Sequence, residues 1–207
     1  MFHASFVAVA VSLVMMATVS CASKTASVGV VFENDWQLGA EMLTPQEQSI
    51  VRRTALQTLQ HAFMDFGLFV SEGRGADRLL VVDKGYVAGL RQAGQPAPVG
   101  ETYPFALVSM VHVEETFHAL LAVACCDEIA ARRKKTRAEI VEALGRGIGS
   151  TAAHELGHQA GFMFAVDSDC DDCYDSHTSK TYEHFFGTKH WSGRALPIMR
   201  RVLPPAP

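Results

Sequence analysis

The feature that most constrains this chain is a pair of histidines, His154 and His158, near the end of a long predicted helix. Apolar residues recur at helical spacing before the pair, so the pattern predicts a helix over about residues 136–159. Glycines in its middle lower the intrinsic helix propensity, and packing against neighbouring elements must therefore hold it. Residues four apart lie on one face of a helix, so both imidazoles can reach one cation.

Glu155 completes the pattern H-E-x-x-H. Its side chain is rotated away from a cation held by His154 and His158, yet it stays beside a water molecule bound to that cation. Zn2+ suits such a pair and lowers the pKa of its bound water to about 7. Glu155 can then take a proton from the water and pass it to a leaving amine. The motif therefore predicts a metallopeptidase (metalloendopeptidase) that uses Zn2+, with Glu155 as general base.

The eight residues from His154 to Gly161 read HELGHQAG and resemble the metzincins, a group of zincin metallopeptidases with H-E-x-x-H-x-x-G. The resemblance implies that His154 and His158 bind zinc and that Glu155 is the catalytic base. It also implies an α/β (α+β) zincin-like domain, in which a mixed sheet packs on a long N-terminal helix and an active-site helix. The substrate would lie along an antiparallel edge strand.

The third metal ligand is where the sequence departs from the metzincin pattern. Metzincins place a histidine, sometimes an aspartate, three residues after the glycine, and Phe164 stands there and cannot bind a metal. Asp167 is our first choice, because an insertion of three residues would bring it to the usual place. His177 is the second choice, and Glu183 would make the site resemble the zincins with a glutamate ligand. The remaining candidates are Asp169, His184 and His190.

Residues 170–174 resemble the cysteine-bearing stretch after the motif in archaemetzincins, where a methionine turn follows. Tyr174 would stand where that methionine is expected. Met199 is an alternative floor under the metal, or an ordinary core methionine on a terminal helix.

The cysteines favour disulfides, because four remain in an exported chain once Cys21 is set aside. We expect a bridge that ties the region of Cys125 and Cys126 to the loop of Cys170 and Cys173. A four-cysteine zinc site is the alternative, although adjacent cysteines are awkward tetrahedral ligands.

The first 22 residues read as an export signal. Residues 6–19 form an almost unbroken apolar run, and no charged side chain precedes Lys24 apart from His3. Signal peptidase could cut near Cys21, or residues 18–21 could act as a bacterial lipobox, so that a lipidated Cys21 attaches the protein to a membrane. An uncleaved anchor is the third reading, although the run is short for a full span. We expect a periplasmic, secreted or membrane-anchored protein, with residues 23–207 as the peptidase domain.

Local patterns predict the other elements. Thr44 can cap a helix, Pro45 suits its first turn and Glu47 completes a capping box, so a helix is predicted from there to about Gly67. His112 and His118 fall in predicted strands, where a lone histidine is more often structural. The predicted strands are 28–32, 78–83, 105–113 and 117–124, with a loop over 84–102.

Composition and charge limit the partners. The chain has 207 residues, of which 48% are hydrophobic and 19% charged, as in an ordinary globular domain. A net charge of −4 does not call for nucleic acid, and the basic run at 132–137 reads as a solvated loop or helix entry. We therefore expect a monomer that binds a peptide or protein substrate and no nucleic acid. The alternative is a non-catalytic zinc-binding exported lipoprotein with a degenerate zincin fold.

Overall fold

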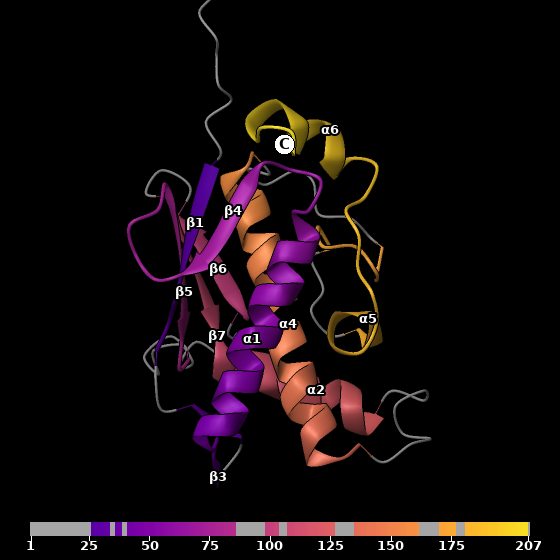
Figure 1. Cartoon of the computed structure of the whole chain (residues 1–207). Helices are drawn as coiled ribbons and strands as arrows, with labels where there is room; N and C mark the ends of the chain where they lie inside the picture. The colour runs from indigo at the N-terminus through magenta and orange to yellow at the C-terminus, as the bar shows by residue number, and fades with distance from the viewer. Residues whose placement is uncertain are drawn as a thin grey trace, which may run out of the picture.

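The computed structural model describes residues 26–33, 36–38, 41–85, 98–103, 107–126, 135–161, 170–176 and 181–206. In this part of the chain, α1 and α4 lie side by side against one face of a five-stranded sheet (Figure 1). No helix among these residues is long and apolar enough to cross a membrane. The predicted export signal and Cys21 lie outside the described residues. The elements are β1 Ala26–Phe32, β2 Gln37–Leu38, β3 Glu41–Met42, α1 Pro45–Ala62, β4 Leu68–Glu72, β5 Arg78–Asp83, β6 Gly100–Tyr103, β7 Val108–His112, α2 Val113–Cys126, α4 Arg137–Gln159, α5 Tyr182–Phe185 and α6 Ala195–Val202.

The sheet is mixed, with strand order β4-β1-β5-β7-β6. The pairs β1–β4, β1–β5 and β5–β7 are parallel, whereas β6 runs antiparallel to β7 at the edge of the sheet. Thr102 of β6 pairs with Ser109 of β7, so both side chains project from the same face. That face is covered by α4, and the α/β class predicted from the sequence is confirmed.

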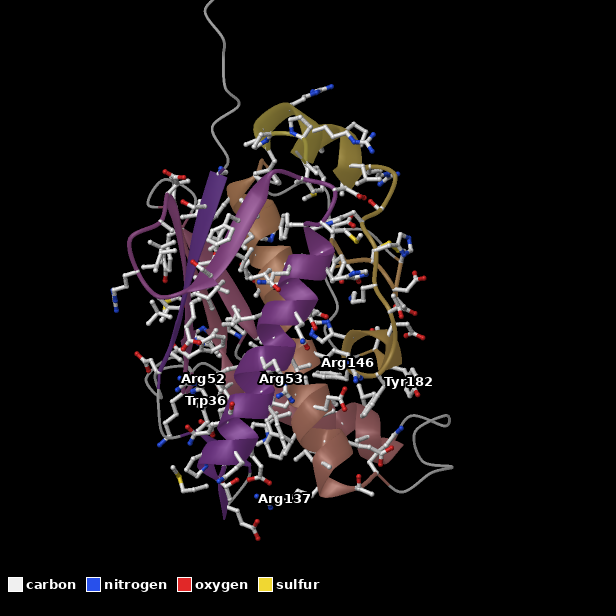
Figure 2. All side chains as sticks on the ribbon, in the orientation of Figure 1. Trp36, Arg52, Arg53, Arg137, Arg146 and Tyr182 are labelled. Carbon is white, nitrogen blue, oxygen red and sulfur yellow. A yellow bond between two sulfur atoms is a disulfide. The ribbon has the colours of Figure 1, made fainter. Side chains whose placement is uncertain are left out.

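Capping boxes begin both long helices. Thr44 Oγ1 accepts a hydrogen bond from the Glu47 amide at 3.2 Å, and the Glu47 carboxylate accepts one from the Thr44 amide at 2.9 Å. Thr136 and Glu139 form the same reciprocal pair at the start of α4. Arg137 then binds the carboxylate of Glu47 and lowers its pKa to about 2. Figure 2 shows Arg137 at the end of the molecule where the two helices begin, so these contacts align their first turns.

Glycines on α4 allow the close approach of α1. A Cβ atom at Gly145 would lie 2.8 Å from the main-chain oxygen of Val51. At Gly149 it would lie 2.6 Å from the main-chain oxygen of Ala55 and 2.6 Å from Cβ of Thr58. The residues that weaken the helix by propensity therefore also provide the surface that packing needs.

The structure corrects two predicted elements and adds elements that were not predicted. The strand predicted at 117–124 is wrong, because α2 is a helix of 14 residues over Val113–Cys126. Its buried residues Phe117, Leu120 and Val123 recur every three positions, as one face of a helix does. The predicted loop at 84–102 contains most of strand β6, and β4 was not predicted.

Candidate metal centre

His154 and His158 converge at the C-terminal end of α4. Their Nε2 atoms lie 2.9 Å apart, and the two rings are nearly perpendicular, at 88°. Two nitrogens bound to one zinc at a tetrahedral angle would lie about 3.3 Å apart. The two imidazoles therefore need only a small adjustment to share a cation, as their spacing in the sequence suggests. Their role as ligands stays a prediction.

The hydrogen bond at the other ring nitrogen determines which tautomer His154 adopts. His154 Nδ1 lies 3.0 Å from the main-chain oxygen of Tyr174. A carbonyl oxygen can only accept, so Nδ1 donates, and a neutral His154 has its lone pair on Nε2. That is the atom that faces His158. A histidine fixed in this way is typical of metal sites, where the second nitrogen donates to a carbonyl or carboxylate.

The turn that carries Tyr174 is held from both sides. The Tyr174 amide donates to the main-chain oxygen of His190 at 2.7 Å, and the His190 amide donates to that of Asp172 at 3.0 Å. The Tyr174 ring is buried against Trp191, and burial raises its pKa to about 12. Tyr174 therefore occupies the turn beside His154 and contributes a main-chain oxygen. Met199, the alternative, is fully buried in the core on α6.

Glu155 is buried between α4 and strand β6, with 6% of its surface exposed. Its Oε2 atom accepts a hydrogen bond from Thr102 Oγ1 at 2.6 Å. Burial is the largest influence on its pKa and raises it, whereas the Thr102 bond and the charge of His158 act in the opposite direction. The carboxylate is therefore held next to the histidine pair in an environment poor in water.

The preferred third ligand, Asp167, lies outside the described residues, as do Asp169 and His177. Its assignment stays a prediction. Within the described residues, no third His, Cys, Asp or Glu joins His154 and His158 with ligand atoms all within 4.8 Å of one another.

His184, one of the described candidates, links α5 to α4 instead. Its Nε2 atom lies 3.2 Å from Thr151 Oγ1, and its main-chain oxygen accepts a bond from Ser150 Oγ at 3.4 Å. Burial and the nearby charge of Lys189 hold the pKa of His184 well below its usual value. It is therefore a neutral core histidine.

The cysteine pairing differs from our expectation. Cys170 is bonded to Cys173 within its own loop, so the expected bridge from this loop to the region of Cys125 and Cys126 is wrong. The side chains of that region lie outside the described residues. Cys170, Asp172, Cys173 and His190 also place ligand atoms within 4.8 Å of one another. This group could hold a metal only after reduction of the disulfide, because thiolates are the ligands.

No sequence pattern pointed to the residues that surround Glu155. Thr102 and Gly100 lie in a segment rich in glycine and proline that was predicted to be a loop, and only pairing with β7 makes it a strand. His112 was expected to be structural. Its Nδ1 atom lies 2.8 Å from Asp83 Oδ1, at the ends of the parallel strands β7 and β5.

We predict that the contribution of His112 to stability decreases as the pH rises. Burial lowers the pKa of His112. The Asp83 hydrogen bond and the charges of Asp83, Glu101 and Glu115 together raise that pKa by more, so the net shift is upward. A raised pKa means that the stabilisation is complete below about pH 6.5 and is lost as the pH passes the folded-state pKa. Replacing His112 by Asn should therefore lower the Tm more at pH 6 than at pH 9.

Calorimetry at both pH values checks this, with His118→Asn as the control. The His118 side chain is 59% exposed on α2, so its replacement should change the Tm little at either pH. A Tm loss for His112→Asn that stays constant or grows with pH would contradict the prediction.

No protein-family model and no curated protein matches this chain by sequence. The solved structures that are similar to it include the following two. One is a zinc-dependent peptidase from Methanocorpusculum labreanum (strain Z), with a TM-score of 0.51, 13% identity, and coverage of 84% of this chain and 100% of that one. The other is the archaemetzincin of Methanopyrus kandleri, with a TM-score of 0.53, 14% identity, and coverage of 87% and 96%. At these identities the likeness shows a shared fold.

Proposed function

We propose that this chain, which has the metzincin-like fold of the zincin metallopeptidases, is a zinc-dependent peptidase that hydrolyses peptide bonds. The observation that carries the proposal is the 2.9 Å approach of the Nε2 atoms of His154 and His158 on one face of α4. Glu155 lies between them in the sequence, and an antiparallel edge strand lies beside it. One structural neighbour is a zinc-dependent peptidase and the other an archaemetzincin, which supports the assignment.

Each residue of the centre has a separate task. His154 and His158 would hold the metal, with Asp167 as the third ligand, and Tyr174 keeps the His154 ring in the orientation that offers Nε2. When bound, zinc supplies a Lewis acid that polarises a carbonyl and makes water more acidic. Glu155 accepts a proton at its carboxylate and returns it to the nitrogen of the leaving amine.

Strand β6 offers a place for the substrate. Among the described residues it pairs with β7 on one side only and so forms an edge of the sheet. An extended peptide can add to such an edge as a further strand. Because Thr102 of β6 contacts Glu155, a peptide bound there would run past the proposed base. This geometry supports peptides in extended conformation as the proposed substrate class.

Metal analysis of the purified protein tests the proposal. We expect about one zinc ion per chain, because zinc sites of this class hold a single ion. A chelator should remove the zinc and the hydrolysis of a peptide library together, and added Zn2+ should restore both. The variant His158→Ala should lose the metal, and His118→Ala, at an exposed position on α2, should keep it.

Two outcomes would contradict the proposal in different ways. A protein that retains no zinc would be a zincin fold without a metal. A protein that holds zinc but cleaves no peptide in the library would support the alternative, a non-catalytic zinc-binding exported lipoprotein. Export and lipidation at Cys21 stay predictions, and labelling with a radioactive fatty acid in a bacterial host addresses them.

A further inference from the structure

A chain of hydrogen bonds leads through the sheet to the proposed base. Gln159 Nε2 donates to Ser109 Oγ at 2.7 Å, and Ser109 Oγ lies 2.9 Å from Thr102 Oγ1. Thr102 Oγ1 then donates to Glu155 Oε2 at 2.6 Å. These four side chains come from α4, β7 and β6, and the series of hydrogen bonds begins and ends on α4.

The chemical groups at the two ends favour one donor-to-acceptor direction for these hydrogen bonds. The Gln159 amide nitrogen can only donate, and an ionised carboxylate can only accept. Each hydroxyl between them, on Ser109 and Thr102, can therefore accept one bond and donate the next. Both hydroxyls also lie near the main-chain oxygen of Glu155, at 2.9 Å from Thr102 Oγ1 and 3.3 Å from Ser109 Oγ. Hydroxyls in such a series polarise one another. The last bond is as short as an O–H···O⁻ bond to a charged acceptor, which is about 2.5–2.7 Å.

Strand β6 also limits the space around Glu155. A Cβ atom at Gly100 would lie 2.8 Å from Glu155 Oε1 and 2.9 Å from its Cγ atom. The main chain of the strand therefore presses directly on the side chain that Thr102 binds. Gly100 leaves room for the carboxylate, and Thr102, two positions along β6, fixes the direction in which the carboxylate points.

From this geometry we propose that Thr102 is a positioning residue, which orients the Glu155 carboxylate. Strand β6, which would bind the peptide, would then also orient the proposed base. This inference rests on the proposed function, because it gives Glu155 the role of general base. The Thr102 hydroxyl contacts the carboxylate of the proposed base and takes no proton from the substrate itself. Its effect on catalysis is through Glu155.

Removal of the Thr102 hydroxyl tests the role in the zinc-loaded protein. Thr102→Val keeps the shape of the side chain and should lower kcat about 10–100-fold, with KM changed by less than about threefold, because misplaced groups lose rate more than binding. Thr102→Ser keeps the hydroxyl and should retain most of the activity. Ser27→Ala is the matched control, since Ser27 Oγ donates to Asp77 Oδ2 at 2.8 Å and has no part in the series of bonds from Gln159 to Glu155. It should leave kcat unchanged.

A second measurement needs neither metal nor activity. In the metal-free protein, Thr102→Val should lower the Tm by roughly 3–10 °C, as the loss of a bond to a charged group does in a chain of this size. The same substitution in a Glu155→Ala background should lower it by less, because the carboxylate acceptor is gone and only the main-chain oxygen of residue 155, 2.9 Å from Thr102 Oγ1, remains. This double-mutant cycle measures the coupling between the two side chains directly.

The two measurements separate the inference from the proposed function. If the wild-type protein with zinc cleaves no peptide, the proposed function fails, and the Tm cycle alone decides whether Thr102 holds Glu155. If the wild type is active but Thr102→Val keeps its kcat, the positioning role is overturned. Equal Tm losses in both backgrounds overturn it as well. A drop in kcat that Thr102→Ser restores, together with coupled Tm losses, supports it.

Discussion

The variant Glu155→Gln should hydrolyse peptides about 10²–10⁴-fold more slowly than the wild-type protein, which is the usual contribution of a general base. Glutamine has nearly the same shape, and its amide oxygen can still accept the bond from Thr102. It cannot take a proton at neutral pH. The zinc content should stay at the wild-type level, because Glu155 is not a proposed ligand.

Steady-state kinetics and metal analysis on the same preparation check this prediction. Glu142→Gln is the matched control, since Glu142 lies on α4 with a side chain that is 53% exposed and pairs with Arg146 at 2.7 Å. Its activity should equal that of the wild type. If Glu155→Gln keeps more than about a tenth of the activity, the residue is not the base. A loss of zinc in this variant would instead make Glu155 part of the metal-binding structure.

A methyl group at Gly149 should destabilise the protein by about 1–3 kcal/mol, as overpacking of a close contact does. Alanine favours a helix over glycine by up to about 1 kcal/mol. At this position the clash outweighs that gain, because the new Cβ atom would lie 2.6 Å from the main-chain oxygen of Ala55 on α1. Neither helix can move aside without loosening the core between α1 and the sheet.

The expected decrease in Tm for Gly149→Ala is roughly 2–12 °C for a chain of this length, measured by calorimetry on the metal-free protein. Gly193→Ala is the control, because a Cβ atom there meets nothing within 4 Å. Its Tm should stay within about 2 °C of the wild type. A Tm of Gly149→Ala at or above the wild-type value would show that α1 and α4 can separate at little cost.

Both long helices could be predicted because their signals are local. Thr44 with Glu47, and the apolar stripe before His154, lie within a few residues of the elements that they define. The same local signals failed at α2. A continuous apolar run fits a buried strand as well as a helix, and only the packing of Phe117 and Leu120 against the core decides between them.

The candidate site was predictable in part for the same reason. His154 and His158 are one helical turn apart, so the sequence alone brings them together. Thr102 acts on Glu155 across 53 positions of sequence, and its strand exists only through pairing with β7. No local sequence pattern predicts such a contact. Whether Asp167 completes the set depends on a loop path that spacing does not determine.

Contacts within the chain itself hold α4 in place. Its glycines pack against α1, and Gln159 and Glu155 form hydrogen bonds with side chains of the sheet. His154 is hydrogen-bonded to the main-chain oxygen of Tyr174. In small zinc modules the ion supplies the energy of folding, and its removal unfolds the chain. Because α4 is held here by contacts of the chain itself, we expect a chelator to remove a bound ion without unfolding the protein.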